Sequence, residues 1–128
     1  MNFYLDIDGT IITKDHKQAN GLNFFLTSLF KNGDVYWLTT HCKEINNESL
    51  LSYLKPVLDK DNFALITKVK PTVWQTLKTE AINFSEPFQW FDDYILEIEK
   101  EVLKKNNSLN NWVRVDLNKN DDLTKYLF

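Results

Sequence analysis

The sequence predicts an α/β fold, in which a parallel five-stranded sheet lies between helices in three layers. Short apolar segments alternate along the chain with segments whose apolar residues recur at helical spacing, and this alternation is typical of strand–helix–strand units. No repeat, low-complexity segment or Pro/Gly-rich linker interrupts the pattern. The length of 128 residues and the 43% of hydrophobic residues fit one domain over residues 1–128.

Five short apolar runs are predicted as strands. The first covers residues 2–8 and ends at acidic residues and Gly9, where the chain can turn sharply. The fourth is followed by a pair of aspartates that stops the apolar run. In chain order, the predicted strands after the first are residues 35–38, 63–66, 88–91 and 112–115.

Helices are predicted between these strands. Residues 17–31 carry apolar side chains at helical spacing and are followed by Asn32-Gly33, a common helix end. A second helix is predicted over residues 46–58, with Pro56 near its end. A third is predicted over residues 71–82, because Pro71 suits the first turn of a helix. Two further helices are expected, one around residues 95–102 and one over residues 121–128.

Composition limits the classes of partner. The net charge is −3 and the 15 basic residues are spread along the chain, which does not indicate a large nucleic-acid interface. A single cysteine, Cys42, cannot form an internal disulfide and is typical of a reduced compartment. The sequence begins without a signal-peptide pattern, and no apolar run reaches the roughly 20 residues that span a bilayer. We therefore expect a cytoplasmic protein without membrane contact.

Polar side chains gather where the predicted strands end. In parallel sheets, ligands bind beyond the carboxyl ends of the strands. Asp6 and Asp8 end the first strand, and Asp92 and Asp93 end the fourth. Because carboxylates held close together repel one another unless a cation is present, this edge predicts a metal site. Oxygen ligands without a His or Cys cluster favour Mg²⁺, which commonly pairs with a substrate phosphate.

Neighbouring residues fit such a site. Gly9 lets the backbone turn away after the acids, and Thr10 can brace that turn by hydrogen bonding. Thr39, Thr40 and His41 follow the second strand and meet the same edge. His41 is either a substrate contact or part of a helix-start surface. His16 lies in the loop after the first strand and is a candidate gate residue.

These segments resemble the motifs of the haloacid dehalogenase (HAD) superfamily over about the whole chain. Residues 3–10 match its first motif, an apolar strand ending in D-x-D-G-T. Residues 35–39 match the second motif, a strand ending in Thr or Ser, and residues 88–93 match the fourth, a strand ending in paired acids. The resemblance implies a Rossmann-like HAD core and a Mg²⁺-dependent phosphatase.

The same resemblance implies roles for individual residues. Asp6 is then the nucleophile that forms an aspartyl-phosphate, and Asp8 is the general acid and base. The Asp6 carboxylate, the Asp8 backbone carbonyl and Asp92 hold Mg²⁺. Thr39 donates a hydrogen bond to the phosphoryl group, and Asp93 supports the metal or orients the lysine.

The lysine of the third family motif has more than one candidate. Lys78 lies in a segment that resembles the lysine segment of some small family members, and it is preferred for that reason. Lys70, followed by Pro71, resembles the lysine-proline version of other members. Lys68 is a third candidate.

The short connections between the predicted strands leave no room for a cap domain. An open site suits a bulky phosphorylated substrate, or a site completed by a second subunit in a homo-oligomer. The alternatives to a phosphatase are a phosphotransferase, a nucleic-acid end-processing phosphatase, and a non-catalytic HAD-like binding module.

Overall fold

A computed structural model describes residues 1–127 and contains one parallel sheet. The strands lie in the order β2-β1-β3-β4, with all neighbouring pairs parallel. The α/β class and the parallel sheet are therefore confirmed, but the sheet has four strands and not the five that the sequence predicts. The strand bounds are β1 (Asn2–Leu5), β2 (Asp34–Trp37), β3 (Phe88–Asp92) and β4 (Trp112–Arg114).

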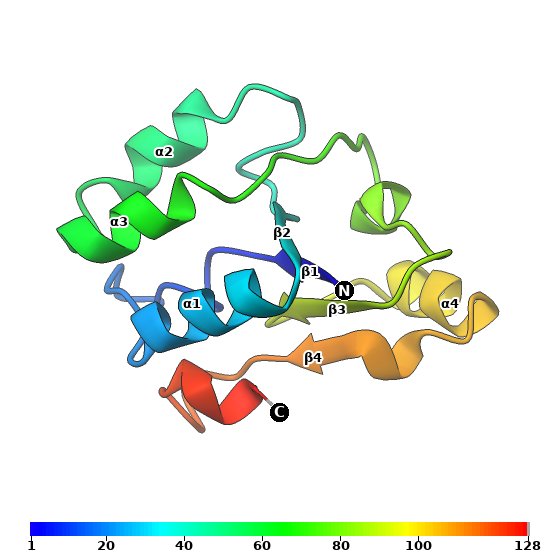
Figure 1. The fold of residues 1–128 in the computed structure, drawn as a ribbon. Coiled ribbons are helices and arrows are strands. Elements are labelled where there is room, and N and C mark those ends of the chain that lie inside the picture. Colours follow the sequence, from blue (N-terminus) through cyan, green and yellow to red (C-terminus); the bar gives the residue numbers. More distant parts are fainter. Residues whose placement is uncertain (128) are drawn as a thin grey trace.

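Helices connect successive strands (Figure 1). Helix α1 (Leu22–Asn32) follows β1, and the α2–α3 pair (Glu48–Leu54 and Lys60–Ile66) follows β2. Helix α4 (Glu97–Lys105) joins β3 to β4. Short 3₁₀ helices cover Lys78–Ala81, Leu109–Asn111 and Leu123–Tyr126, the last where the sequence predicts a helix over 121–128. Residue 128 lies outside the described residues. Among residues 1–127, none of the helices is long and apolar enough to cross a membrane.

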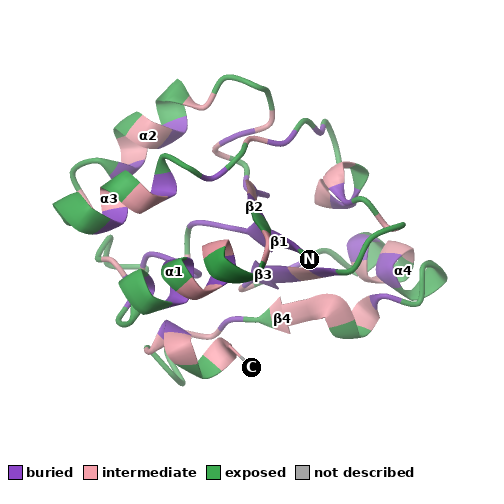
Figure 2. Ribbon diagram, in the orientation of Figure 1, coloured by how far each residue is buried: buried purple, intermediate pink, exposed green. Residues whose placement is uncertain are grey.

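The two faces of the sheet bury separate apolar clusters. Phe3 and Leu5 of β1 pack with side chains of α1, α2 and α3 on one face. Tyr4 points to the other face, where it packs with Trp90 and with Leu103 of α4. This alternation follows from the strand geometry, which sends successive side chains to opposite sides. The central strands β1 and β3 are almost entirely buried, whereas the outer sides of α2 and α3 are exposed (Figure 2).

The predicted third strand is wrong, because residues 63–66 form the second half of α3. Asp59 precedes this helix, and its side chain accepts a hydrogen bond of 2.8 Å from the backbone N–H of Asn62. Such an N-cap stabilises the start of a helix. The apolar run of residues 63–66 alone fits a strand or a helix, and the cap favours the helix. The strand position at this edge is instead taken by Lys70, whose N–H and C=O bond to Val35 and Trp37 of β2.

The predicted helix over residues 71–82 is also wrong, since only Lys78–Ala81 is helical, as a 3₁₀ turn. The Thr72 hydroxyl donates to the carbonyl of Trp37 at 2.6 Å. The Glu80 carboxylate accepts from the backbone N–H groups of Gln75, Thr76 and Leu77. These bonds to side chains and to β2 replace the bonds that a helix would make with itself.

Candidate active site

The carboxyl ends of β1, β2 and β3 meet at one edge of the sheet. The N–H of Asp6 donates to the carbonyl of Phe91 at 3.0 Å, which continues the pairing of β1 with β3. On the other side, the N–H of Leu38 donates to the carbonyl of Leu5 at 2.7 Å. Thr39, Asp6 and Asp92 are therefore brought to neighbouring positions by backbone hydrogen bonds.

Three carboxylates gather at this edge, and we call Asp6, Asp92 and Asp93 the acidic cluster. One oxygen from each lies within 4.8 Å of the others. Asp6 and Asp92 are buried, and Asp93 is half-buried. The Lys78 ammonium lies 2.6 Å from Asp92 Oδ2 and 3.4 Å from Asp6 Oδ1. The structure thus brings together four of the predicted site residues, and it places Asp93 among the oxygens that could hold a metal.

The acidic cluster carries more negative charge than its single lysine can balance. Burial, together with the negative charge of Asp6, raises the pKa of Asp92 to about 8 against the opposing effect of Lys78. Burial and Asp6 also raise the pKa of Asp93. Burial alone would lower the pKa of Lys78, but Asp6 and Asp92 outweigh it and raise that pKa. These shifts describe a site that favours an additional cation.

A buried glutamate holds Lys78 in position. Glu99 of α4 accepts the backbone N–H of Lys78 at 2.8 Å and that of Leu96 at 2.9 Å. Because Leu96 follows closely on the acid pair, Glu99 ties the lysine turn to the segment that leaves β3. Sequence reasoning missed Glu99. The available signal was its place three residues after Leu96, where a glutamate commonly accepts N–H groups at a helix start.

The other two lysine candidates lie away from the acids. The Lys70 ammonium pairs with Asp34 at 3.1 Å and lies 5.6 Å from the centre of the Tyr36 ring. Asp34 begins β2, so Lys70 points toward the opposite end of the strand from Thr39. Lys68 is exposed. Of the three lysines, only Lys78 is placed to act with Asp6.

Gly9 allows the chain to turn directly against the acidic cluster. Its φ of +77° lies in the left-handed region that favours glycine. A Cβ atom here would overlap Asp93 Oδ2, so any side chain would displace this carboxylate. The turn is closed by backbone bonds, including Thr10 N–H to the Ile7 carbonyl at 3.1 Å. The buried Thr10 hydroxyl has no hydrogen-bond partner among residues 1–127, so it does not brace the turn as expected.

Thr39 is fully buried at the end of β2. Its hydroxyl oxygen accepts the N–H of His41 at 3.3 Å, and its carbonyl accepts the N–H of Cys42 at 3.2 Å. The hydroxyl is the acceptor in the bond to His41, so its proton is not used there. Thr40 is exposed in the same turn.

The Asp8 carboxylate makes a second set of contacts, with residues outside the acidic cluster. Its carboxylate accepts a 2.6 Å hydrogen bond from the Tyr53 hydroxyl and lies 2.6 Å from His41 Nε2. Tyr53 stacks on His41, with ring centres 4.2 Å apart and an angle of 17°. His16 Nδ1 lies 3.4 Å from the Tyr53 hydroxyl. We call these four residues the Asp8 group.

The contacts of the Asp8 group favour the ionised form of Asp8. Burial acts in the opposite direction, but the hydrogen bonds from Tyr53 and His41 lower the pKa of the carboxyl. Burial and the bond to Asp8 raise the pKa of Tyr53 to about 12. Sequence reasoning missed Tyr53 because it comes from α2, which strand-end rules do not place. The sequence predicted His41 and His16 near the site, but it did not predict the contacts of the Asp8 group.

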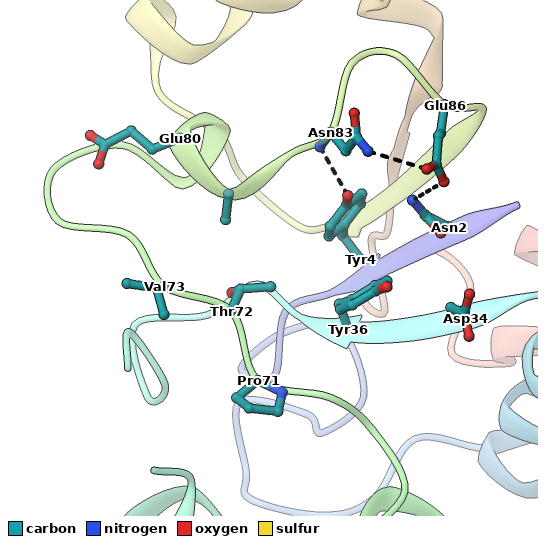
Figure 3. Close-up of a pocket in the computed structure, with 11 residues that line it drawn as sticks. Asn2, Tyr4, Asp34, Tyr36, Pro71, Thr72, Val73, Glu80, Asn83 and Glu86 are labelled. Carbon is teal, nitrogen blue, oxygen red and sulfur yellow. Dashed lines mark hydrogen bonds between the residues drawn. The ribbon is translucent and has the colours of Figure 1, made fainter. Parts of the chain in front are cut away.

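A separate cavity of about 490 Å³ lies on the sheet face next to the amino-terminal part of β1. It is lined by the stacked rings of Tyr4 and Tyr36 and by three carboxylates (Figure 3). Its polar groups are already paired: Asn2 donates to Glu86, and Asn83 donates to the Tyr4 hydroxyl and to Glu86. Asp34 of its lining is paired with the exposed Lys70, so these groups hold one another and the cavity does not compete with the strand-end site.

The strand-end site thus combines a buried acidic cluster, one buried lysine and a more exposed aspartate held by two aromatic residues. These features belong to residues that are far apart in the sequence and close in the fold. The chain was also compared with protein-family models, with curated proteins and with solved structures, and none of these comparisons gave a match.

Proposed function

We propose that the chain is a Mg²⁺-dependent phosphatase with a HAD-like core that lacks a cap domain. One observation carries the proposal: Lys78 lies beside Asp6 and Asp92 at the carboxyl ends of parallel strands, with Asp8 two residues further on. A nucleophilic carboxylate, a second carboxyl group for proton transfer and a fixed cation are the groups that phosphoryl transfer through an aspartate needs.

The acidic cluster fits a hard divalent cation. Its three carboxylates exceed the charge of Lys78, and burial together with the charge of Asp6 raises the pKa of Asp92. Mg²⁺ binds oxygen ligands and retains waters, so a partly open cluster of aspartates suits it. Asp6 and Asp93 would hold the ion with Asp92 and the Asp8 carbonyl. When bound, the ion neutralises charge on the transferring phosphoryl oxygens.

In the first step, a carboxylate oxygen of Asp6 forms a bond to phosphorus while the bond from phosphorus to the leaving oxygen breaks. Asp8 donates its proton to that oxygen, which departs as an alcohol. Lys78 and the Thr39 hydroxyl donate hydrogen bonds to the phosphoryl oxygens and stabilise their charge. A bound phosphate dianion beside Asp8 raises the pKa of this carboxyl, which favours the protonated form that the first step requires.

In the second step, Asp8 is ionised and takes a proton from water. The water oxygen attacks phosphorus, the bond from phosphorus to Asp6 breaks, and inorganic phosphate is released. The hydrogen bonds from Tyr53 and His41 favour this ionised form, which is the base that the step needs. Asp6 is then free for another turnover.

Hydrolysis of a generic aryl phosphate, with Mg²⁺ and with EDTA, tests the proposal. We expect Mg²⁺-dependent turnover that falls by about 10³-fold or more in Asp6→Asn, because covalent catalysis depends on that carboxylate. Asp34→Asn is a matched control, since Asp34 is exposed and, within residues 1–127, its carboxylate pairs only with Lys70. Its turnover should equal that of the wild type. Turnover that survives in Asp6→Asn, or is absent in the wild-type protein, would contradict the proposed chemistry.

A further inference from the structure

The position of Asp8 shows where the leaving group of the substrate lies. On the proposed mechanism, on which this inference rests, Asp8 gives its proton to the leaving oxygen. The part of the substrate attached to that oxygen must then lie among the surroundings of the Asp8 carboxylate. These surroundings are formed by Tyr53, His41 and His16.

A cavity of about 310 Å³ lies at this position. Its lining includes the carboxylates of Asp8 and Asp93 and the side chains of Tyr53 and His16. The cavity therefore joins reacting groups to two planar side chains. A substrate whose phosphate lies at Asp6 would extend its leaving group into this space.

The planar wall of the cavity is held rigidly. The Tyr53 ring is fixed on one side by stacking on His41 at 4.2 Å, and its hydroxyl is fixed by Asp8 at 2.6 Å. Tyr53 lies on α2, whose Leu50 and Leu54 are fully buried. His16 adopts a φ of +58°, and its N–H donates to the carbonyl of Thr13 at 3.0 Å. Little side-chain freedom is left to lose when a ring packs here.

The charges around the cavity do not favour a polyanion. Among its described lining residues, Lys14 is the one lysine or arginine, and it lies with the carboxylates of Asp8 and Asp93. An adjoining cavity of about 410 Å³ adds Arg114, but also Asp15, Asp116 and Asp121. A nucleic-acid strand needs a basic groove along its backbone. A small phosphomonoester with an uncharged ring needs none.

We infer that the substrate is a small phosphomonoester whose leaving group carries a planar aromatic ring, and that this ring packs against Tyr53 beside His16. Tyr53 has two separate effects on such a substrate. Its hydroxyl positions Asp8 for every substrate, whereas its ring contacts only the leaving group. A nucleoside and a simple arylmethyl alcohol share the required planar ring.

The experiment compares benzyl phosphate with cyclohexylmethyl phosphate. Both release a primary alcohol and differ in the planarity of the ring, so the ratio of their kcat/KM values reports on ring packing. We expect the wild type to favour the benzyl ester by about fivefold to tenfold, the range given by stacking on one aromatic side chain. The ratio does not depend on the folded fraction of a variant, because both esters meet the same enzyme.

Two substitutions separate the ring of Tyr53 from its hydroxyl. Tyr53→Phe should lower both rates and keep the ratio, because the ring remains. Tyr53→Leu should bring the ratio close to one. Tyr36→Leu removes a stacked tyrosine from the distant cavity and should change neither rate nor ratio. Uridine 5′-monophosphate adds a third substrate: a kcat/KM above that of benzyl phosphate identifies a nucleoside as the leaving group, and one below it identifies a simpler aryl group.

The failures of the inference and of the proposed function are distinguishable. Equal kcat/KM for the two esters in the wild type, or an unchanged ratio in Tyr53→Leu, would overturn the inference while Mg²⁺-dependent, Asp6-dependent hydrolysis remained. Absence of hydrolysis of either ester by the wild type would overturn both.

Discussion

The acidic cluster and the Asp8 group begin at the same strand end, yet they are built differently. Asp6 and Asp92 have side chains that are 11% and 1% exposed, and Lys78 is 13% exposed. The Asp8 side chain is 54% exposed and lies against His41 and a helix from another part of the chain. The acidic cluster and Lys78 are fixed by strand pairing and burial, whereas the Asp8 group is fixed by side-chain contacts at the surface. We expect substitutions in the acidic cluster and at Lys78 to affect stability and metal binding most, and substitutions in the Asp8 group to affect substrate preference.

The largest effect is expected from Lys78→Met in the metal-free protein. Removing a cation from a buried ion pair leaves uncompensated carboxylates and typically costs about 3–5 kcal/mol. We expect a loss of about 3 kcal/mol in the free energy of unfolding, measured with urea in the presence of EDTA. Lys70→Met breaks an exposed pair with Asp34, which solvent screens, and should change the free energy of unfolding far less. Equal losses in the two variants would show that burial does not distinguish the two pairs.

The pH dependence of the metal-free protein comes next in size. The pKa of Asp92 is raised to about 8 in the folded state from 3.8 in the unfolded state, because of burial and the charge of Asp6. The folded state therefore binds more protons than the unfolded state between these values, and stability falls as the pH rises from about 4 to about 8. We expect the free energy of unfolding to decrease by a few kcal/mol across this window.

Asp92→Asn tests the origin of that slope. The variant cannot ionise at this position, so its unfolding free energy should vary less over the same pH range. Saturating Mg²⁺ should also flatten the wild-type curve, because a bound cation stabilises the ionised cluster. A slope that is unchanged by both treatments would assign the pH dependence to other groups.

Two glycines provide a matched pair for the contact between the turn and the acidic cluster. Gly9 and Gly21 have φ values of +77° and +74°, and a Cβ at either would lie close to a carboxylate oxygen. Each Ala variant should lose about 1–2 kcal/mol of stability from left-handed strain and displacement. Only Gly9→Ala displaces Asp93, so only this variant should bind Mg²⁺ more weakly in calorimetry. Equal Mg²⁺ affinities would exclude Asp93 from the metal site.

The acidic end of β1 could be predicted from the sequence because all of its signals are local. An apolar strand followed by Asp6, Asp8 and Gly9 defines both the direction of the strand and the side chains at its end. The acids after β3 follow from the same rule. The choice of Lys78 depended on a resemblance, and the structure places this lysine beside Asp6 and Asp92. Their catalytic roles stay predictions.

The elements that the sequence misassigned depend on contacts with distant residues. Residues 63–66 fit a strand or a helix, and the Asp59 cap selects the helix. Residues 71–82 show apolar residues at helical spacing, but Thr72 bonds to β2 and Glu80 bonds to the backbone ahead of it. Tyr53 reaches Asp8 from a position 45 residues later in the chain. Periodicity does not encode such contacts, since it reports only the local repeat.

The smallest effect on stability is expected from a substitution in the Asp8 group. Tyr53→Phe removes one of the two hydrogen bonds that lower the pKa of Asp8. The pKa of Asp8, measured from its carboxyl carbon by NMR titration of the metal-free protein, should therefore rise toward its ordinary value. Tyr36→Phe removes a hydroxyl far from the site and should leave that pKa unchanged.

The accompanying change in stability is limited by the exposure of Asp8. A lowered pKa stabilises the folded state above the unfolded pKa, and this contribution is lost as the pH falls through the folded value. Because solvent screens an exposed carboxylate, we expect Tyr53→Phe to lose less than about 1 kcal/mol at pH 7, with the difference from wild type disappearing in acid. A loss as large as that of Lys78→Met would place Asp8 among the buried, stability-determining charges and remove the distinction between the two sets.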